Sequence, residues 1–400
     1  MAEIKLTKKE AKEFIVNAQN LSGAKLPGGE KSILSVLNRL RLVQVDSISV
    51  AGANHDIVFN SRIRNFQSEQ LERVLYDKKF AFESYAKGLC ILPIESRPFF
   101  ESNIKWMEEQ YAKPLGDHKQ TVKAILDRIK KSGPMSSADF KNSSDLPGIR
   151  PGDQRTIRML TDILWATGRI VISHRKGRIR YFDIPKEKAG RSGERIDEKE
   201  CQRHQALDRF KAMRLFKMSG GSAEPWAGVR SYRKEFHREF LDNGILLEVE
   251  IENCRWPYYI LSEDIHFIDA KTRPDKHVRF LAPLDSMTWD RSFVKEVFDF
   301  ECSFEVYKKK EHRKYGYYCL PILYGNDFVG RCDIAKDKDK NAMCVHSVHW
   351  EKGFKIYDDF LNAFAYELAD YARFLGMESI RLPKGKFTGK EKLKKLISNR

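Results

Sequence analysis

The stretch RTIRMLTDILWATGRIVISHRKGRIRYFDI, residues 155–184, decides the fold class. Its first half has Ile157, Leu160 and Leu164 at the spacing of one buried helix face, and a glycine follows as a stop signal. The runs IVISH and IRYFDI then flank the turn residues RKGR, a pattern typical of a β-hairpin. Two shorter helices are predicted upstream, in residues 122–129 and in SGPMSSADF. Three helices followed directly by a hairpin predict a winged helix.

The polar residues of this unit predict a DNA-binding surface. A helix that enters a groove and a wing that touches phosphates both need polar or cationic side chains. The candidates are Gln154, Arg155, Arg158 and Thr161 on the outward face of the third helix, and Arg175, Lys176 and Arg178 at the hairpin tip. The alternative is that both are solvated faces, because many winged helices mediate protein contacts.

The length of 400 residues exceeds what one hydrophobic core usually supports, so several domains are expected. Helices followed by short strands also occur on either side of the clearest unit, and the charged segment 185–200 is expected to be a linker. We therefore predict an α+β protein with tandem winged-helix domains and a C-terminal antiparallel β-barrel-like domain. The predicted domains are 1–115, 116–190, 191–265 and 266–400.

The composition points to a polyanionic partner. A net charge of +16 together with 12% aromatic residues favours nucleic acid, and a membrane surface is the weaker alternative. No stretch has the length of a signal peptide core or a membrane span, so a cytoplasmic protein is expected. The seven cysteines are scattered and never spaced as C-x-x-C, which argues against disulfides and structural zinc. No metal and no cofactor are expected.

The stretch LRLVQVDSISVAGANHDIVFNSRIR, residues 40–64, contains the candidate active site. Gln44 and Asp46 are two residues apart, so on a strand through residues 43–48 an amide and a carboxylate would point the same way. Downstream, His55, Arg62 and Arg64 could place cations beside that carboxylate. The alternative is a solvated strand face or the start of a turn.

Several segments together resemble the bacterial winged-helix DNA glycosylase superfamily, which removes alkylated bases and unhooks interstrand crosslinks. They are RFLAPLDSMTWDR at 279–291, FEVYKKKEHRKYGYYCLPILYGNDFVGRCD at 304–333, GPMSSADF, the 155–184 stretch, and VQVDSI followed by His55 and SRI. VQVD is similar to the Gln-x-Asp signature of the broad crosslink-repair branch, and the self-resistance branch has Gln-x-Gln instead. The resemblance implies tandem winged helices closed by a C-terminal β-barrel.

The chain departs from the pattern of that family at three positions near the expected site. Ala53 stands where an arginine is usual, Lys87 where a histidine is usual, and Tyr85 where a tryptophan is usual. His55 and Lys87 are candidates for supporting the site, and the alternative for His55 is a purely structural role. The basic segment KKKEHRK at 308–314, expected to be a hairpin, adds Lys309, Lys310 and Arg313 to the candidate DNA contacts, beside Arg62 and Arg64.

The chemistry of alkylated purines fits the Gln44 and Asp46 pair. An N7-alkylated purine is already cationic, so what needs stabilisation is the oxocarbenium-like sugar and the attacking water. A carboxylate about 4 Å away would offer roughly 4 kcal/mol, on the order of a thousandfold in rate. Asp46 would be this group, and the Gln44 amide would hold the water or the sugar.

We therefore expect a monofunctional DNA glycosylase that acts on double-stranded DNA containing alkylated or crosslinked purines. We expect it to be monomeric, cytoplasmic and associated with the nucleoid. The rival hypothesis is a winged-helix transcriptional regulator, because winged helices serve that role more often than catalysis. A nuclease is disfavoured because no acidic cluster suggests a two-metal site.

Overall fold

The computed structural model describes residues 4–140, 146–150, 152–185, 196–218, 225–229, 231–268 and 276–398. The chain forms two compact units. The first unit consists of Met1–Gln70, Lys87–Cys90 and Ala206–Arg400, and the second consists of Leu71–Ala86 and Ile91–Gln205. The first predicted domain, 1–115, thus contributes residues to both compact units. The four-domain division stays a prediction, and most of its linker, 186–195, lies outside the described residues.

The first unit begins with a short strand and a helix whose start the sequence specifies. The Thr7 hydroxyl accepts a hydrogen bond from the backbone N–H of Glu10, and the Glu10 carboxylate accepts one from the backbone N–H of Thr7. This capping box satisfies two N–H groups that a helix start leaves unpaired. The elements of this segment are β1 (Ile4–Leu6), α1 (Lys8–Ala18), α2 (Glu30–Leu40), β2 (Val43–Gln44) and α3 (Asn54–Asn60).

A three-stranded sheet and its helices form one core of the first unit. Strand β1 pairs in parallel with β7 (Leu246–Ile251), and β7 pairs antiparallel with β8 (Tyr258–Leu261). The buried face of α1, including Phe14 and Ile15, packs with Val249, Ile260 and residues of α11 (Arg291–Phe298) in one hydrophobic cluster. The helix α10 (Arg233–Asp242) precedes β7.

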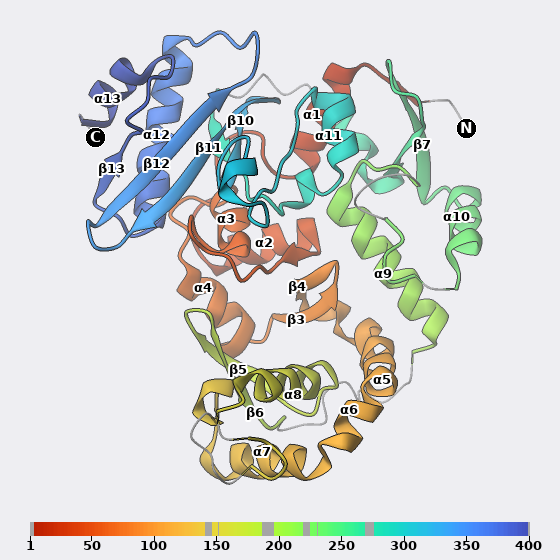
Figure 1. Ribbon diagram of the computed structural model, residues 1–400. Coiled ribbons are helices and arrows are strands. Elements are labelled where there is room, and N and C mark those ends of the chain that lie inside the picture. The colour runs from red at the N-terminus through yellow and green to blue at the C-terminus, as the bar shows by residue number, and fades with distance from the viewer. Residues whose placement is uncertain are drawn as a thin grey trace. The chain divides into compact units, whose positions relative to one another are not determined.

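The C-terminal part of the first unit is a curled, five-stranded, half-barrel sheet covered by a long helix (Figure 1). The sheet order is β13-β12-β11-β10-β9, with β9 to β12 antiparallel and β13 parallel to β12. Phe364 and Tyr371 of the helix place their rings against Phe280 of β9. The elements are β9 (Val278–Phe280), β10 (Cys319–Tyr324), β11 (Asp327–Asp337), β12 (Ala342–Trp350), α12 (Asp358–Phe374), β13 (Ser379–Arg381) and α13 (Lys390–Ser398).

The second unit contains the three-helix and hairpin order that the sequence predicts. Its hydrophobic cluster joins Ile125 and Ile129 with Leu160, Leu164 and Phe182. The middle helix is the 3₁₀ turn η3, at whose start the Asp139 carboxylate accepts hydrogen bonds from the Ser136 N–H and hydroxyl. The elements are α7 (Lys119–Ser132), the 3₁₀ helix η3 (Ser137–Phe140), α8 (Gln154–Ala166), β5 (Val171–Lys176) and β6 (Ile179–Asp183).

Before α7 the second unit has a strand and further helices. The strand β3 (Ala81–Ala86) follows the π-helix η1 (Arg73–Asp77), and η2 (Ile94–Phe100), α5 (Glu101–Gln110) and α6 (Ala112–Asp117) come next. Three elements contain residues of both compact units: α4 (Ser68–Glu72), β4 (Gly88–Pro93) and α9 (Glu198–Met213).

Two short helices of the first unit lie at its candidate site and at its C-terminal end. Residues 54–60 form α3, which carries Asn54 and His55. The basic C-terminal segment forms α13, which is anchored by the buried side chain of Leu393. In the described residues, no helix is long and apolar enough to cross a membrane.

Candidate active site

Gln44 lies at the end of β2, in a segment that three hydrogen bonds to backbone groups hold in place. The N–H of its neighbour Val45 donates to the carbonyl oxygen of Leu89 at 2.8 Å. The Nδ2 of Asn54 donates to the Gln44 carbonyl oxygen at 2.8 Å, and the Oδ1 of Asn54 accepts from the N–H of Leu284 at 3.0 Å. Asn54 is fully buried. It thus fixes the Gln44 backbone against the 283–285 turn.

The side chain of Gln44 lies against Gly88 and keeps an unused acceptor. Gly88 has φ +68°, and a Cβ atom there would lie 3.3 Å from Gln44 Nε2. Both the left-handed backbone and this close approach favour glycine. The Gln44 Oε1 atom is buried and accepts no hydrogen bond from the described residues. A buried polar atom without a partner is uncommon and marks a place where a ligand or water can bind.

Asp46 lies beyond the end of the strand and not on it. The strand β2 stops at Gln44, and the Oδ1 of Asp46 accepts a hydrogen bond from the N–H of Ile48 at 2.6 Å. An aspartate that bonds its backbone two residues on forms an Asx turn, which competes with a strand. The expected strand through residue 48 is therefore wrong, and alternation along a strand does not orient Asp46. Gln44 and Asp46 are both half-buried.

The loop after Asp46 is anchored to the C-terminal sheet and its helix. The N–H of Lys336 on β11 donates to the Val50 carbonyl oxygen at 2.9 Å. The Tyr371 hydroxyl, on α12, donates to the Ala51 carbonyl oxygen at 2.6 Å. These two bonds hold adjacent residues of the loop through their backbone carbonyl groups and leave the side chains of the loop unused.

Tyr318 is a buried residue near the candidate site that the sequence does not indicate. It is 1% exposed and directly precedes β10, and its backbone N–H donates to Asp333 Oδ1 at 3.1 Å. Burial, and then the Asp46 carboxylate, raise the pKa of the Tyr318 phenol above its ordinary value. The phenol therefore keeps its proton at neutral pH and can donate a hydrogen bond.

His55 and Lys87 both belong to the first unit. His55 lies in the first turn of α3, and its Nε2 is 3.7 Å from Asp56 Oδ1. Its Nδ1 is buried and has no hydrogen-bond partner among the described residues. Lys87 directly precedes Gly88, and its Nζ lies 5.4 Å from the Trp289 ring centroid. Burial, and then the Arg209 guanidinium, lower the pKa of the Lys87 ammonium below its ordinary value.

Arg62 is not available for the phosphate contact expected of it. Its guanidinium is buried, and its Nη1 lies 2.7 Å from the Asp285 carboxylate. Its Nε donates to the Gln19 carbonyl oxygen at 2.9 Å. Arg62 is thus a structural residue, whereas Arg64 is exposed.

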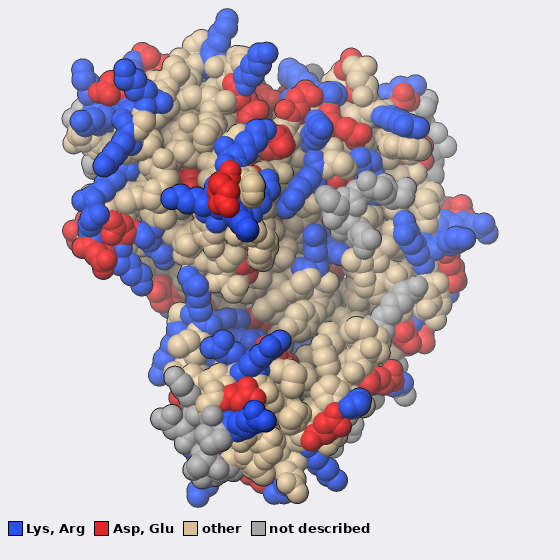
Figure 2. Space-filling model, viewed as in Figure 1, with Lys and Arg blue, Asp and Glu red and all other residues tan. Residues whose placement is uncertain are grey.

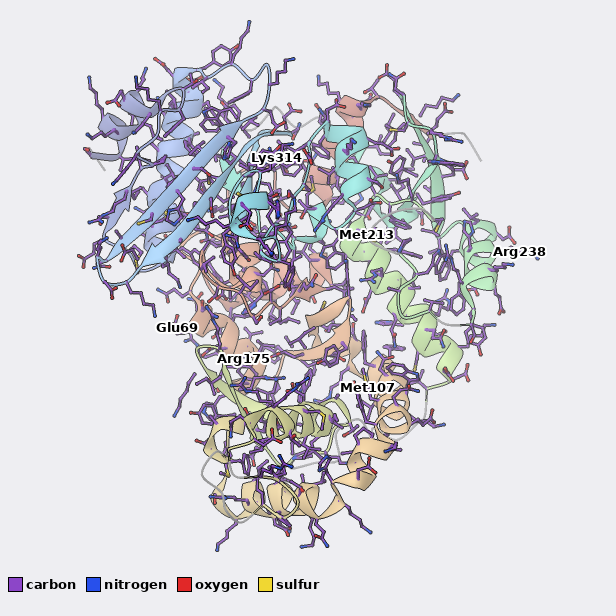
Figure 3. All side chains as sticks on the ribbon, viewed as in Figure 1. Glu69, Met107, Arg175, Met213, Arg238 and Lys314 are labelled. Carbon is purple, nitrogen blue, oxygen red and sulfur yellow. The ribbon has the colours of Figure 1, made fainter. Side chains whose placement is uncertain are left out.

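The basic residues of the second unit likewise include one that is engaged in structural contacts and others that are exposed. Arg175, labelled in Figure 3, forms an ion pair with Glu83 at 2.5 Å, and its Nε donates to the Tyr76 hydroxyl at 2.8 Å. The expected role of Arg175 at the hairpin tip is therefore not supported. Thr161 is buried, with its hydroxyl donating to the backbone of α8, so it does not face outward. The exposed candidates are Arg155, Arg158, Lys176 and Arg178.

The segment 308–314 is a loop with a 3₁₀ turn, η6 (Lys310–His312), and not the expected hairpin. The buried Glu305 carboxylate organises this loop because it accepts from Lys308 Nζ at 2.7 Å and from the Tyr315 N–H at 2.8 Å. Lys309 and Lys310 are exposed, and Arg313 stacks over Tyr317 at 4.7 Å. Lys314, labelled in Figure 3, pairs with Glu301 at 2.6 Å.

The charges of the surface are mixed. Figure 2 shows lysine and arginine side chains over much of the face in view, with acidic groups between them. Among the described residues, no group of three histidine, cysteine, aspartate or glutamate side chains could hold a metal ion. All seven cysteines are free thiols, and four of them are buried.

Comparisons with known proteins agree with the resemblance seen in the sequence. The family model described as "DNA glycosylase AlkZ-like" matches residues 37–374, which include Gln44, Asp46, Lys87 and Tyr318. A solved structure, the DNA glycosylase AlkZ of Streptomyces sahachiroi, is similar in fold, with a TM-score of 0.62 and 16% sequence identity. The similarity covers 95% of this chain and 99% of that one. The chain therefore belongs to the AlkZ-like family of DNA glycosylases.

Proposed function

We propose that this glycosylase hydrolyses the N-glycosidic bond of N7-alkylated purines and thereby unhooks interstrand crosslinks formed through them. The observation that supports this is the arrangement at the end of β2. One oxygen of the half-buried Asp46 carboxylate is held by the Ile48 N–H, and two residues earlier the Gln44 amide oxygen has no partner in the described structure. A fixed carboxylate can stabilise a cationic sugar, and an acceptor without a partner can hold a water molecule.

The reaction is a single displacement at the sugar carbon. The bond between C1′ and N9 breaks, and its electron pair neutralises the cationic purine, which leaves as the free modified base. A water oxygen bonds to C1′ and gives its proton to the Asp46 carboxylate. Asp46 also stabilises the positive charge that develops on the sugar. We propose that Gln44 orients the water or the sugar, and that His55 and Lys87 support the site.

The proposed activity on crosslinks requires a carboxylate that can reach a lesion within the duplex. A purine tethered to the opposite strand cannot leave the base stack completely, so the reacting group has to reach the lesion within the duplex. Asp46 and Gln44 remain partly exposed, which is compatible with such an approach. A carboxylate at the bottom of a closed base pocket would accept only a flipped base.

We propose that tandem winged helices bind the duplex around the lesion. The contacts in the second unit would come from Arg155, Arg158, Lys176 and Arg178, and those in the first unit from Arg64, Lys309, Lys310 and Arg313. We expect the enzyme to act as a monomer in the cytoplasm, in association with the nucleoid. Membership in a glycosylase family removes the reason to keep a transcriptional regulator as the alternative.

The direct test uses two duplexes, one with a single N7-methylguanine and one with an interstrand crosslink between N7 positions. The expected products are free modified base and an abasic strand that breaks in alkali, and separated strands from the crosslinked duplex. The spontaneous depurination rate, measured without enzyme, is subtracted. A release rate equal to this background on both duplexes would refute the proposed activity.

A further inference from the structure

The Tyr318 hydroxyl is a buried hydrogen-bond donor that is left without a partner. The residue is 1% exposed, and its hydroxyl makes no hydrogen bond to any described residue. The rest of Tyr318 is well held, since its N–H donates to Asp333 and its ring meets Phe304 edge-on at 6.1 Å. Leaving a buried polar group unsatisfied costs about 1–3 kcal/mol. Such a group in a native protein calls for an explanation.

Strand β11 contacts both the backbone of Tyr318 and the loop that follows Asp46. Asp333 of β11 binds the backbone of Tyr318, and Lys336 of β11 binds the Val50 carbonyl oxygen. These two attachment points are three residues apart, roughly 10 Å along a strand. The electrostatic influence of Asp46 on the phenol agrees with this proximity.

The other ionisable groups around the phenol are Asp333, whose oxygens accept backbone N–H groups, and Tyr371, whose hydroxyl donates to Ala51. Tyr371 in turn lies within electrostatic range of Cys332, Glu367 and Asp56. Each Asp333 oxygen already accepts a backbone N–H, and the Tyr371 hydroxyl already donates to Ala51, whereas among the described residues the Gln44 Oε1 atom and the Asp46 carboxylate have acceptor capacity left. Of these two acceptors, the Asp46 carboxylate is charged and therefore forms the stronger hydrogen bond. Its Oδ1 takes one hydrogen bond, from Ile48, and a carboxylate can accept several.

We propose that Tyr318 is a positioning residue of the glycosylase site, whose hydroxyl donates a hydrogen bond to the Asp46 carboxylate when the damaged nucleotide is bound. This inference rests on the proposed function, in which Asp46 is the reacting carboxylate. A hydrogen bond to the ionised form favours that form and fixes its direction. Together with Ile48 it would hold the carboxylate from two sides.

The test compares Tyr318→Phe with the wild-type enzyme and with Tyr258→Phe. Tyr258 is a matched control because it is also a fully buried tyrosine of the first unit, and its hydroxyl already donates to a carboxylate, that of Glu296. For each enzyme, the single-turnover rate of N7-methylguanine release is measured from acid to neutral pH, and thermal unfolding is followed in parallel.

We expect Tyr318→Phe to release base about ten- to hundredfold more slowly at neutral pH, the effect of one hydrogen bond to a charged group. The acidic limb of its pH–rate profile should move to higher pH, because the charged form of Asp46 loses a donor. Its Tm should stay equal to that of the wild type or rise, since no bond of the free protein is removed. Tyr258→Phe should lower the Tm and leave the acidic limb in place.

These outcomes distinguish a failure of the positioning role of Tyr318 from a failure of the proposed glycosylase function. Native rates in Tyr318→Phe, or a slower enzyme with an unmoved acidic limb, overturn the positioning role while the proposed function stands. A wild-type enzyme that releases no base above background overturns the proposed function, and the role of Tyr318 with it. A lower Tm in Tyr318→Phe would show that the hydroxyl has a structural partner in the free protein, which also contradicts the inference.

Discussion

The side-chain amide of Asn54 donates to the carbonyl oxygen of Gln44 at 2.8 Å and accepts from the N–H of Leu284 at 3.0 Å. One buried side chain thus connects the segment proposed to be catalytic to a turn more than two hundred residues away. We expect Asn54→Ala to leave both backbone groups unsatisfied, at a cost of about 1–3 kcal/mol for each group. Urea unfolding of Asn54→Ala should show this loss, whereas Asn38→Ala on the exposed face of α2 should change the free energy of unfolding by less than about 0.5 kcal/mol. Equal stability of the two variants would contradict the role of Asn54.

Asp46→Asn should abolish base release and leave DNA affinity nearly unchanged. The amide keeps the size of the side chain but removes the negative charge that stabilises the oxocarbenium-like sugar. The expected loss is on the order of a thousandfold in single-turnover rate. Gln44→Ala should cost less, because only orientation is lost. Excision by Asp46→Asn at close to the native rate would mean that another residue performs the chemistry.

Some basic residues of the β5–β6 hairpin should contribute to DNA binding, and another should contribute to the stability of the protein. If Lys176 and Arg178 touch phosphates, replacing each by alanine should make the slope of log K against log salt concentration shallower by roughly 0.9. Arg175→Ala should instead destabilise the protein, because it leaves the buried Glu83 carboxylate without its ion-pair partner. The measurements are binding titrations at several salt concentrations and thermal unfolding. An unchanged slope in the Lys176→Ala, Arg178→Ala double variant would assign this hairpin to another role.

The enzyme should be monofunctional, with water and not an amine as the nucleophile. Residues 40–60 contain no lysine, and Lys87 is the amine that needs testing because burial lowers its pKa. Borohydride added during turnover on N7-methylguanine DNA should trap no covalent protein–DNA adduct. An adduct that disappears in Lys87→Ala would refute the hydrolytic mechanism and make Lys87 the nucleophile.

The stability of the protein should depend on pH through Glu305, whose carboxylate holds the loop from Glu301 to Tyr318. Burial of this carboxyl raises its pKa, but hydrogen bonds from Lys308 and from the backbone N–H groups of Tyr315 and Lys314 outweigh it and lower the pKa to about 2. A lowered pKa stabilises the fold above the ordinary value near 4.5, and this stability is lost as the pH falls through about 2.

The variant that tests this loop is Glu305→Gln, with the exposed Glu311→Gln as its control. Glu305→Gln should lose on the order of 3 kcal/mol of stability at pH 7 and flatten the dependence of unfolding on pH between about 4.5 and 2. Glu311→Gln should behave like the wild type. An unchanged pH dependence in Glu305→Gln would show that the carboxylate does not hold the loop.

The sequence predicts those elements whose signals are local. The third helix of the 155–184 stretch and the hairpin after it depend only on residues close in sequence, and both predictions are confirmed by α8 and the antiparallel β5–β6 pair. The strand at Asp46 fails for an equally local reason, because the aspartate side chain bonds the Ile48 N–H and ends the extended segment. Alternation of polar residues alone does not distinguish that turn from a strand.

The roles of charged residues depend on partners that are distant in sequence. Arg62 finds Asp285 at a separation of 223 residues, and Arg175 finds Glu83 at 92, so neither pairing is visible in the local pattern. The local sequence pattern does not indicate Tyr318 either, because its backbone is bound by Asp333 of β11 and its phenol is influenced by Asp46, both distant in sequence. Family resemblance identifies Gln44 and Asp46, but only the fold separates structural cations from exposed ones.

The ion pair of Arg62 and Asp285 has consequences for how this enzyme can be studied. Both side chains are completely inaccessible to solvent, so dissolved ions do not reach them. Electrolyte weakens attraction between charges at a surface, but a pair enclosed by protein is affected much less. An experimenter can therefore raise the ionic strength to release the enzyme from its substrate and expect the scaffold under the Gln44 and Asp46 segment to remain intact.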